Sequence, residues 1–377
     1  MTAIYLDCNA TSPLDPEVMQ ILLYYLGEGF GNEGSRTHDY GARAKKAVQK
    51  ARDQIAAVVA AQHDEVILTS GATESNNIAL LGMIKAAKEL GMSHIITSEI
   101  EHKAVLEPCR VWERRGLEVT VLPVGSGGIV DPEAVRAALR PKTFLVSIMQ
   151  VNNETGIRQP LKEISEVLRD HPAYFHTDAA QGFGKDINSL RNRRIDLISI
   201  SGHKIYAPQG IGALIMRKRK YNRPPIQPLV FGGGQERGLR PGTLPVALIV
   251  ALGTAAEIAV RDHAKRQQAC RKFRRQALNA LFPLNPRLTG NQSLVMDHVL
   301  NLAFPGLDSE ALMVGLKDLI AISNGSACTS SSYSPSHVLK AMGMSDDEAN
   351  SCVRISWCHL TPEVDWEEVA KRIKKML

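Results

Sequence analysis

The chain has 377 residues, of which 44% are hydrophobic and 22% charged, with a formal net charge of +6, as in a soluble globular protein with one large domain and a smaller one. No apolar run is long enough to span a bilayer, which excludes helical membrane spans. The N-terminal stretch MTAIYLDCNATSP has neither the basic start nor the apolar core of a signal peptide, so we expect a cytoplasmic protein.

The first two thirds of the chain alternate between short apolar runs and helical patterns. Helices are expected at 16–26, where Asp15 is the N-cap, and at 38–60. Strands then follow at 65–69, 94–97, 119–123, 143–149, 174–177, 197–201 and 213–216, with helices at 72–90, 103–115, 132–139 and 161–169. This rhythm predicts an α/β fold with a mostly parallel central sheet covered by helices on both faces.

The last third predicts a different organisation. One long helix is expected over 245–281, apolar at first and basic later, as suits an element that leaves one domain for another. Short strands and helices follow, typical of a smaller α+β domain. We therefore expect a large domain over 14–255 and a small domain made of 1–13 with 256–377, which carries a serine-rich loop at about 323–336.

Two basic clusters carry much of the positive charge. One covers 217–220 with Arg223, and the other contains Arg271, Lys272, Arg274 and Arg275 on a predicted helix. Solvated surface is the favoured interpretation of both clusters, with nucleic-acid contact as the alternative. Direct nucleic-acid binding is therefore not expected.

The cysteines are scattered and form no CxxC pair. This spacing argues against a disulfide framework and a zinc site, and no metal site is expected. Free buried thiols are the interpretation for most of them. The six are Cys8, Cys109, Cys270, Cys328, Cys352 and Cys358.

Polar clusters follow several predicted strands, at the edge where ligands bind to parallel sheets. Residues 70–74, SGATE, open a helix whose N–H groups could hold a phosphate, although a plain N-cap by Thr73 or Ser70 would also explain them. Residues 101–104 place His102 at a similar junction, where its ring could stack on a ligand or be structural. Residues 151–156, VNNETG, indicate either a turn or ligand contacts.

Asp178 and Lys204 complete this pattern. Asp178 ends a partly apolar strand and needs a cationic partner if it is buried, such as a protonated ring nitrogen. Lys204 follows the buried strand at 197–201, and a desolvated lysine can act as a nucleophile or form a Schiff base. A phosphate, a protonated ring nitrogen and an aldehyde together describe pyridoxal 5′-phosphate.

The motifs SGATESNN, EHKAVL, VNNETG, HTDAAQ, SGHKIYAPQGIGAL, GGGQERGLRPGT and SNGSACTS resemble those of cysteine desulfurases of the NifS/IscS type. These enzymes form part of the class V aminotransferase branch of the fold-type I pyridoxal-phosphate enzymes, and the match runs from Tyr5 to about Arg354. The resemblance implies a homodimer that removes sulfur from L-cysteine and passes it to an acceptor protein.

The same resemblance implies the roles of individual residues. Lys204, Cys328 and His102 would be catalytic, and Cys328 would take the sulfur as a persulfide. Asn153 and Arg354 would bind the substrate carboxylate. The implied cofactor contacts are Ala72, Thr73, His102, Asn153, Asp178, Gln181, Ser201, His203, Lys204 and, from the neighbouring subunit, Thr243.

Within that reaction, Lys204 would carry the Schiff base and move a proton from the substrate α-carbon. Asp178 would pair with the pyridinium nitrogen and Gln181 with the ring hydroxyl, while His102 would stack on the ring. Thr73, Ser201 and His203 would hold the phosphate.

The sequence departs from the family pattern in three places, of which the last bears on the choice of acceptor. Ala207 replaces a usual glycine, and 357–359 read Trp-Cys-His instead of Leu-Gly-Arg. The chain ends at Leu377, without the longer tail by which the housekeeping iron–sulfur enzymes engage their scaffold. The sulfur could therefore serve iron–sulfur assembly, tRNA thiolation or, in the DndA type, DNA phosphorothioation. The alternatives are a selenocysteine lyase or another class V enzyme, and a sulfur-relay protein without turnover.

Overall fold

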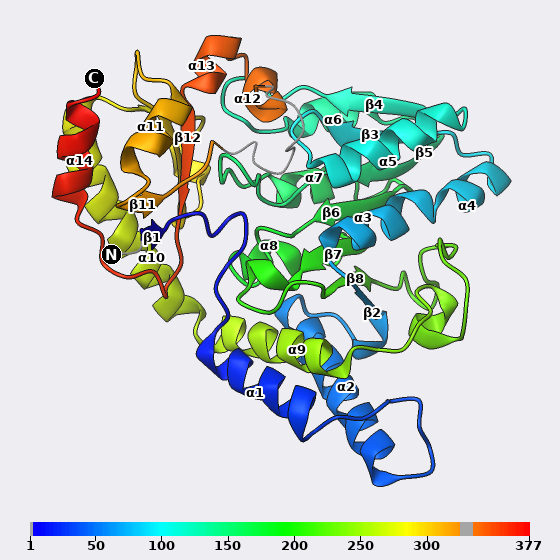
Figure 1. Cartoon of the computed structure of the whole chain (residues 1–377). Helices are drawn as coiled ribbons and strands as arrows, with labels where there is room; N and C mark the ends of the chain where they lie inside the picture. Colours follow the sequence, from blue (N-terminus) through cyan, green and yellow to red (C-terminus); the bar gives the residue numbers. More distant parts are fainter. Residues whose placement is uncertain (1–2, 325–334) are drawn as a thin grey trace.

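A seven-stranded sheet forms the centre of the computed structural model, which describes residues 3–324 and 335–377 (Figure 1). Its strand order is β2-β8-β7-β6-β5-β3-β4, and β8 is antiparallel to both of its neighbours while the other pairs are parallel. The mostly parallel α/β sheet is thus confirmed. The strands are β2 Val66–Thr69, β3 His94–Ser98, β4 Glu118–Leu122, β5 Thr143–Ser147, β6 Tyr174–Asp178, β7 Leu197–Ser201 and β8 Gly212–Met216.

Helices cover both faces of this sheet because successive strand residues point to opposite sides. Val66 and Leu68 belong to a core packed against one set of helices, while Ile67 between them belongs to the core on the other face. The first set comprises α1 Pro16–Gly27, α2 Asp39–Val58, α6 Pro132–Ala138, α7 Leu161–Val167 and α9 Val246–Arg261. The second set comprises α3 Ala72–Leu81, α4 Ile84–Glu89 and α5 Lys103–Arg114.

Two helices that the sequence predicted as continuous are broken, and one short helix was missed. The helix predicted at 72–90 stops at Gly82, which packs so closely that an added Cβ would lie 2.6 Å from Ile226 Cγ2. The helix predicted at 245–281 is interrupted at Asp262, after which α10 His263–Leu281 begins. The missed helix is α8 Ile187–Leu190. Within the described residues no helix is long and apolar enough to cross a membrane.

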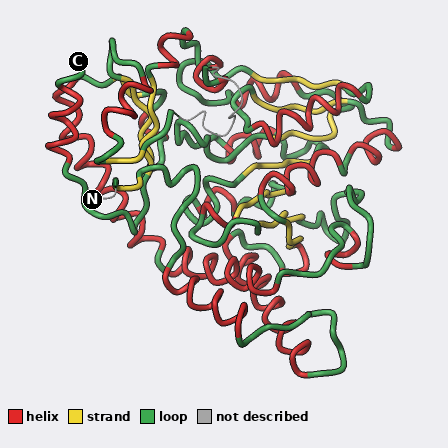
Figure 2. The backbone as a smooth tube through the Cα atoms, in the orientation of Figure 1, coloured by secondary structure: helices red, strands yellow, loops and turns green. Residues whose placement is uncertain are grey.

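A second hydrophobic core brings the N-terminal strand together with the C-terminal part of the chain (Figure 2). β1 Ile4–Tyr5 pairs with β11 Ile320–Ala321, and β10 Val299–Ala303 lies between β9 Arg287–Leu288 and β12 Cys352–Ser356. The helices of this part are α10, α11 Ser309–Leu316, α12 His337–Ala341, α13 Asp346–Asn350 and α14 Trp366–Lys374. Val299 and Met342, from this part of the chain, pack into the core of the large sheet.

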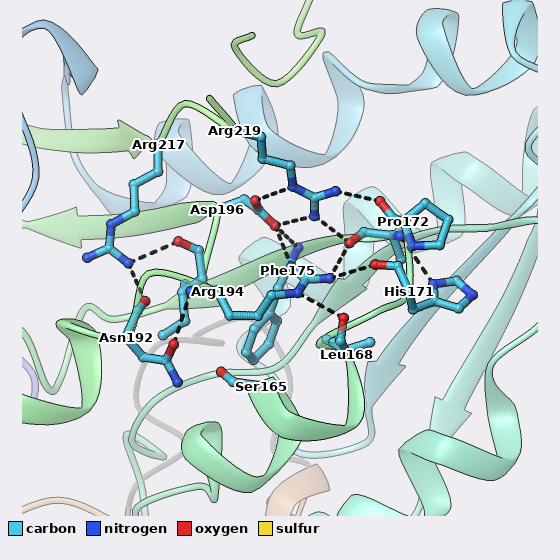
Figure 3. A network of polar contacts seen from close by, with 12 residues as sticks. Ser165, Leu168, His171, Pro172, Phe175, Asn192, Arg194, Asp196, Arg217 and Arg219 are labelled. Atoms are coloured by element: carbon cyan, nitrogen blue, oxygen red, sulfur yellow. Dashed lines mark hydrogen bonds and ion pairs between the residues drawn. The ribbon is translucent and has the colours of Figure 1, made fainter. Parts of the chain in front are cut away.

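Arg217 of the first basic cluster is buried, so the interpretation of the cluster as solvated surface is wrong for this residue. The Arg217 side chain is buried and donates hydrogen bonds to backbone carbonyls, including those of Asn192 and Ile195 (Figure 3). Arg219 forms an ion pair with Asp196. These side chains therefore brace the loops at the ends of the strands, and Arg217 is not exposed at the surface.

The described cysteines are buried and unpaired, as the sequence predicted. The five that the structure describes are buried free thiols: Cys8, Cys109, Cys270, Cys352 and Cys358. Cys328 lies outside the described residues.

Trp357, one of the departures from the family pattern, fills the second core. Its side chain is fully buried, its ring lies 5.0 Å from that of Phe273, and its Nε1 donates to the carbonyl of Cys270 at 3.2 Å.

Trp357→Ala should lower the free energy of unfolding by about 3–5 kcal/mol, because a large cavity would remain. Urea denaturation measures this loss. The exposed Phe282→Ala is the control, and equal losses in both variants would contradict a special role for Trp357.

Candidate active site

Ten of the predicted site residues line one cavity of about 430 Å³. They lie at the carboxyl ends of strands of the large sheet, at the N-termini of helices that follow these strands, and on β12 of the second core. The ten are Ala72, Thr73, His102, Asn153, Asp178, Gln181, Ser201, His203, Lys204 and Arg354. Thr243 is exposed and does not line this cavity, and Cys328 lies outside the described residues.

Lys204 is held by the backbone of the N-terminal segment. It ends the 3₁₀ turn Gly202–Lys204 that follows β7, and its Nζ donates to the carbonyls of Asn9 at 2.5 Å and Ala10 at 2.6 Å. Both residues line the cavity and were missed by the sequence analysis, because backbone acceptors leave no signal in side-chain type. The two carbonyls hold the amine at the floor of the site.

Further contacts fix this segment against the lysine loop. Ser12 Oγ donates to the carbonyl of His203 at 2.7 Å and accepts from the N–H of Tyr206 at 3.1 Å. The N–H of Asp15 donates to the carbonyl of Tyr206 at 3.1 Å. The position of Lys204 therefore depends on residues nearly two hundred positions away in the chain.

Asp178 is a buried carboxylate at the end of β6. Its Oδ2 accepts from Asn76 Nδ2 at 2.7 Å, and its Oδ1 accepts from the N–H of Ala180 at 2.9 Å. Among the described residues, no lysine, arginine or histidine forms an ion pair with it. A buried carboxylate without a cation is costly, so this one is suited to a cationic ligand atom. Asn76, in the SGATESNN motif, is a second residue that the sequence analysis missed.

His102 and Gln181 are oriented by backbone groups. His102 is the N-cap of α5, and its Nδ1 accepts from the N–H of Ala104 at 3.1 Å, so the neutral ring carries its proton on Nε2. Gln181 Nε2 donates to the carbonyl of Asn9 at 2.9 Å. Its Oε1 is buried without a hydrogen-bond partner in the described residues and could accept a bond from a ligand.

The N-terminus of α3 opens on the same cavity. Gly71 is the N-cap, with φ +154°, and no side chain caps the helix, so the alternative of a plain cap by Thr73 or Ser70 is wrong. An added Cβ on Gly212 would lie 2.6 Å from Gly71 Cα, which shows how closely β8 approaches this turn. The uncapped N–H groups of a helix favour an anion such as a phosphate.

His203 lies beside this helix end as a neutral ring. Burial, followed by the charges of Lys204 and Lys185, lowers its pKa to about 4. Its Nδ1 hydrogen-bonds with Thr11 Oγ1 at 3.1 Å. His203 can therefore offer a polar contact to an anion at neutral pH without itself carrying a charge.

Arg354 enters the cavity from β12 and is almost fully buried. Its Nη2 donates to Asp7 Oδ1 at 2.6 Å and its Nη1 to the carbonyl of Asn153 at 2.9 Å, while its Nε has no partner among the described residues. Ser323 pairs with Arg354 through the backbone and donates its hydroxyl to Asp7 at 3.1 Å. The segment that precedes Cys328 is thus attached to the predicted carboxylate-binding residue.

The segment that follows Cys328 is attached to two buried glutamates. Ser336 Oγ donates to Glu154 Oε2 at 2.5 Å, and His337 Nε2 hydrogen-bonds with the carbonyl of Glu101 at 3.0 Å. Burial raises the pKa of Glu154 to about 7 and that of Glu101 to about 8. Both glutamates adjoin site residues in sequence, namely Asn153 and His102.

Comparison with known proteins agrees with this geometry. The sequence profile of the aminotransferase class V family matches residues 4–369. The chain belongs to this family. It also belongs, within the family, to the cysteine desulfurases of the NifS/IscS type, which confirms the resemblance seen in the motifs.

Three relatives support this placement. The cysteine desulfurase IscS of Rickettsia bellii is 46% identical over 98% of this chain and 90% of its own length. The crystal structure of DndA from Streptomyces lividans has a TM-score of 0.83 at 48% identity, covering 93% of this chain and 98% of that one. A structure of SspA in complex with cysteine has a TM-score of 0.81 at 37% identity, covering 94% and 98%.

Glu101 should make stability depend on pH. Because its folded pKa is about 8, the unfolded chain releases this proton at lower pH, and the contribution of Glu101 to stability is lost as pH rises from about 5 to 8. Glu101→Gln keeps an acceptor for Ser98 Oγ and the N–H of Met149 and removes this loss. Relative to the parent, the variant should gain up to about 1.4 kcal/mol per pH unit over that range.

Urea denaturation at pH 5, 6, 7 and 8 measures this difference. The exposed Glu107→Gln on α5 is the matched control and should show no trend with pH. Parallel stability curves for the parent and Glu101→Gln would contradict burial of an ionisable acid at this position.

Proposed function

We propose that the protein is a pyridoxal-phosphate-dependent cysteine desulfurase, in which Lys204, His102 and Cys328 convert L-cysteine to L-alanine and an enzyme persulfide. The observation that carries the assignment of residues is one cavity that contains a lysine amine, a buried carboxylate without a cation, and an arginine. Family membership and the cysteine-bound relative support the same substrate.

The residues of the cavity suit pyridoxal phosphate. Asp178 would hold the protonated ring nitrogen, and Lys204 would bind the aldehyde carbon. The N-terminus of α3, with Ala72, Thr73, Ser201 and His203, would hold the phosphate, and Gln181 the ring hydroxyl. When bound, the cofactor supplies an electron sink that stabilises negative charge at the substrate α-carbon.

Arg354 and Asn153 would bind the carboxylate of the substrate. A guanidinium pairs with a carboxylate through two parallel hydrogen bonds, and Arg354 Nε is without a partner among the described residues. Asp7 holds the other side of the guanidinium and keeps its direction fixed. This contact would place the α-carbon of cysteine near Lys204.

Lys204 and His102 would move the protons. Once released from the carbonyls of Asn9 and Ala10, the amine of Lys204 can take the proton from the α-carbon. His102 carries a proton on Nε2 and can exchange it within the site. The Cys328 thiolate would then attack the substrate sulfur, so that a sulfur–sulfur bond forms as the carbon–sulfur bond breaks and alanine remains.

We further propose a homodimer in which Thr243 of one subunit completes the phosphate site of the other. The exposure of Thr243 supports this, as does an exposed apolar stretch nearby at 229–231.

An acceptor protein would receive the sulfur, in iron–sulfur assembly, tRNA thiolation or DNA phosphorothioation. The likeness to DndA supports the last of these pathways, and the likeness to IscS supports the first.

Cys328→Ala should separate the two halves of the reaction. The variant should keep the visible absorbance of the bound cofactor, while alanine formation from L-cysteine falls at least 100-fold, because no thiolate receives the sulfur. Lys204→Ala is the comparison and should lose turnover together with the borohydride-sensitive absorbance. Unchanged alanine formation by Cys328→Ala would favour the selenocysteine lyase alternative.

Arg354→Lys should raise the KM for L-cysteine at least tenfold and change kcat less, because lysine cannot make the two-point contact with a carboxylate. Steady-state kinetics measures both constants. Arg287→Lys, an exposed arginine on β9 of the same small sheet, is the control and should leave KM unchanged. A KM equal to that of the parent would exclude Arg354 as the carboxylate ligand.

A further inference from the structure

A second cavity, of about 220 Å³, lies between the turn after β6 and helix α10. It does not share a lining residue with the active-site cavity. Its cationic lining consists of Arg158, Lys185, Arg266, Arg271 and Arg274, and the carboxylates on its wall are Asp186 and Asp297. The cavity is therefore a concave, positively charged site that the desulfurase reaction does not use.

The two carboxylates on the wall are already engaged. Asp186 Oδ2 accepts from Ser189 Oγ at 2.8 Å and from Gln150 Nε2 at 3.2 Å. Asp297 pairs with Arg271 at 2.8 Å. Neither carboxylate forms an ion pair with Lys185 in the part of the chain that the structure describes.

Three cations of the cavity are bound only to neutral groups in the described residues. Lys185 Nζ lies 3.5 Å from His298 Nε2, and burial lowers the pKa of His298 well below its usual value, so that ring is neutral. Arg158 donates to the carbonyl of Leu294 at 3.2 Å. Arg274 donates to the carbonyl of Val299 at 2.6 Å and to Gln292 Oε1.

Other groups around the cavity do not neutralise the charges of Lys185, Arg158 and Arg274. Arg266 pairs with Asp15 at 2.6 Å, and its buried Nε and Nη1 have no hydrogen-bond partner among the described residues. Burial raises the pKa of Cys270 to about 12, so its thiol stays protonated. The hydrogen bond from Cys8 lowers the pKa of Cys358, and even a thiolate there would leave the cavity with a net positive charge.

We propose that this cavity binds a compact oxyanion with two negative charges, such as phosphate or sulfate. Lys185 has further N–H donors besides the one facing His298, and Arg158 and Arg274 add charge at the wall. The volume accommodates one small oxyanion. The proposal is independent of the desulfurase reaction.

Calorimetric titration of the cofactor-loaded enzyme with inorganic phosphate tests this proposal, at constant ionic strength and with acetate as a singly charged comparison. The parent should bind phosphate with a dissociation constant of a few millimolar or tighter, and acetate at least tenfold more weakly. Lys185→Met should weaken phosphate binding at least tenfold. Lys272→Met removes the same charge from an exposed position on α10 outside the cavity and should bind like the parent.

Absence of phosphate binding by the parent at 20 mM would overturn the proposal. So would equal affinities of Lys185→Met and Lys272→Met. If Lys185→Met does not fold, as judged by circular dichroism and the cofactor absorbance, Arg158→Met should show the same tenfold weakening, and a parent-like affinity of that variant would also overturn the proposal.

Discussion

The hold of the N-terminal segment on Lys204 is the constraint on which the site depends. This segment leaves the second core after β1, crosses the cavity, and offers the carbonyls of Asn9 and Ala10 to the lysine amine. Partial burial costs an ammonium group free energy unless acceptors replace its water, and the two carbonyls do so. Gln181 donates to the same carbonyl of Asn9, so one backbone group positions residues from two loops of the large sheet.

The same segment also supports the opposite end of the cavity. Asp7 holds Arg354, whose guanidinium is almost fully buried and would be unpaired without this carboxylate. Removing one partner of a buried ion pair commonly lowers the free energy of unfolding by about 3–5 kcal/mol. Separation of Asp7 from Arg354 is therefore unfavourable, and the two side chains stay paired. Because Asp7 and Asn9 are close in sequence, Arg354 and Lys204 are coupled through one turn of the chain at residues 8–10.

Sequence patterns predicted the sheet and most of the cavity because apolar runs end where polar residues begin. Asp178 and Lys204 follow such runs, and the structure brings them to one edge of the sheet. Asn9 and Asn76 were missed, since the first acts through its carbonyl and the second is one amide among several on a helix. Arg217 was misjudged because only the tertiary fold supplies the carbonyls that surround it. The breaks at Gly82 and Asp262 were missed because helical periodicity continues across an interruption of one or two residues.

The flanks of the segment that contains Cys328 contact residues in and beside the active-site cavity. On one side Ser323 contacts Arg354 and Asp7, and on the other Ser336 contacts Glu154. Because burial raises the pKa of Glu154, its carboxyl group is largely uncharged at low pH. It can accept the hydrogen bond from the Ser336 hydroxyl without the full cost of desolvating a charge, which explains why a glutamate is tolerated there. Since these contacts include Arg354, a substrate carboxylate bound there as proposed would lie next to the flank of that segment. In the proposed reaction, Ser323 and Arg354 would then link the binding of the cysteine carboxylate to the segment whose Cys328 accepts the sulfur.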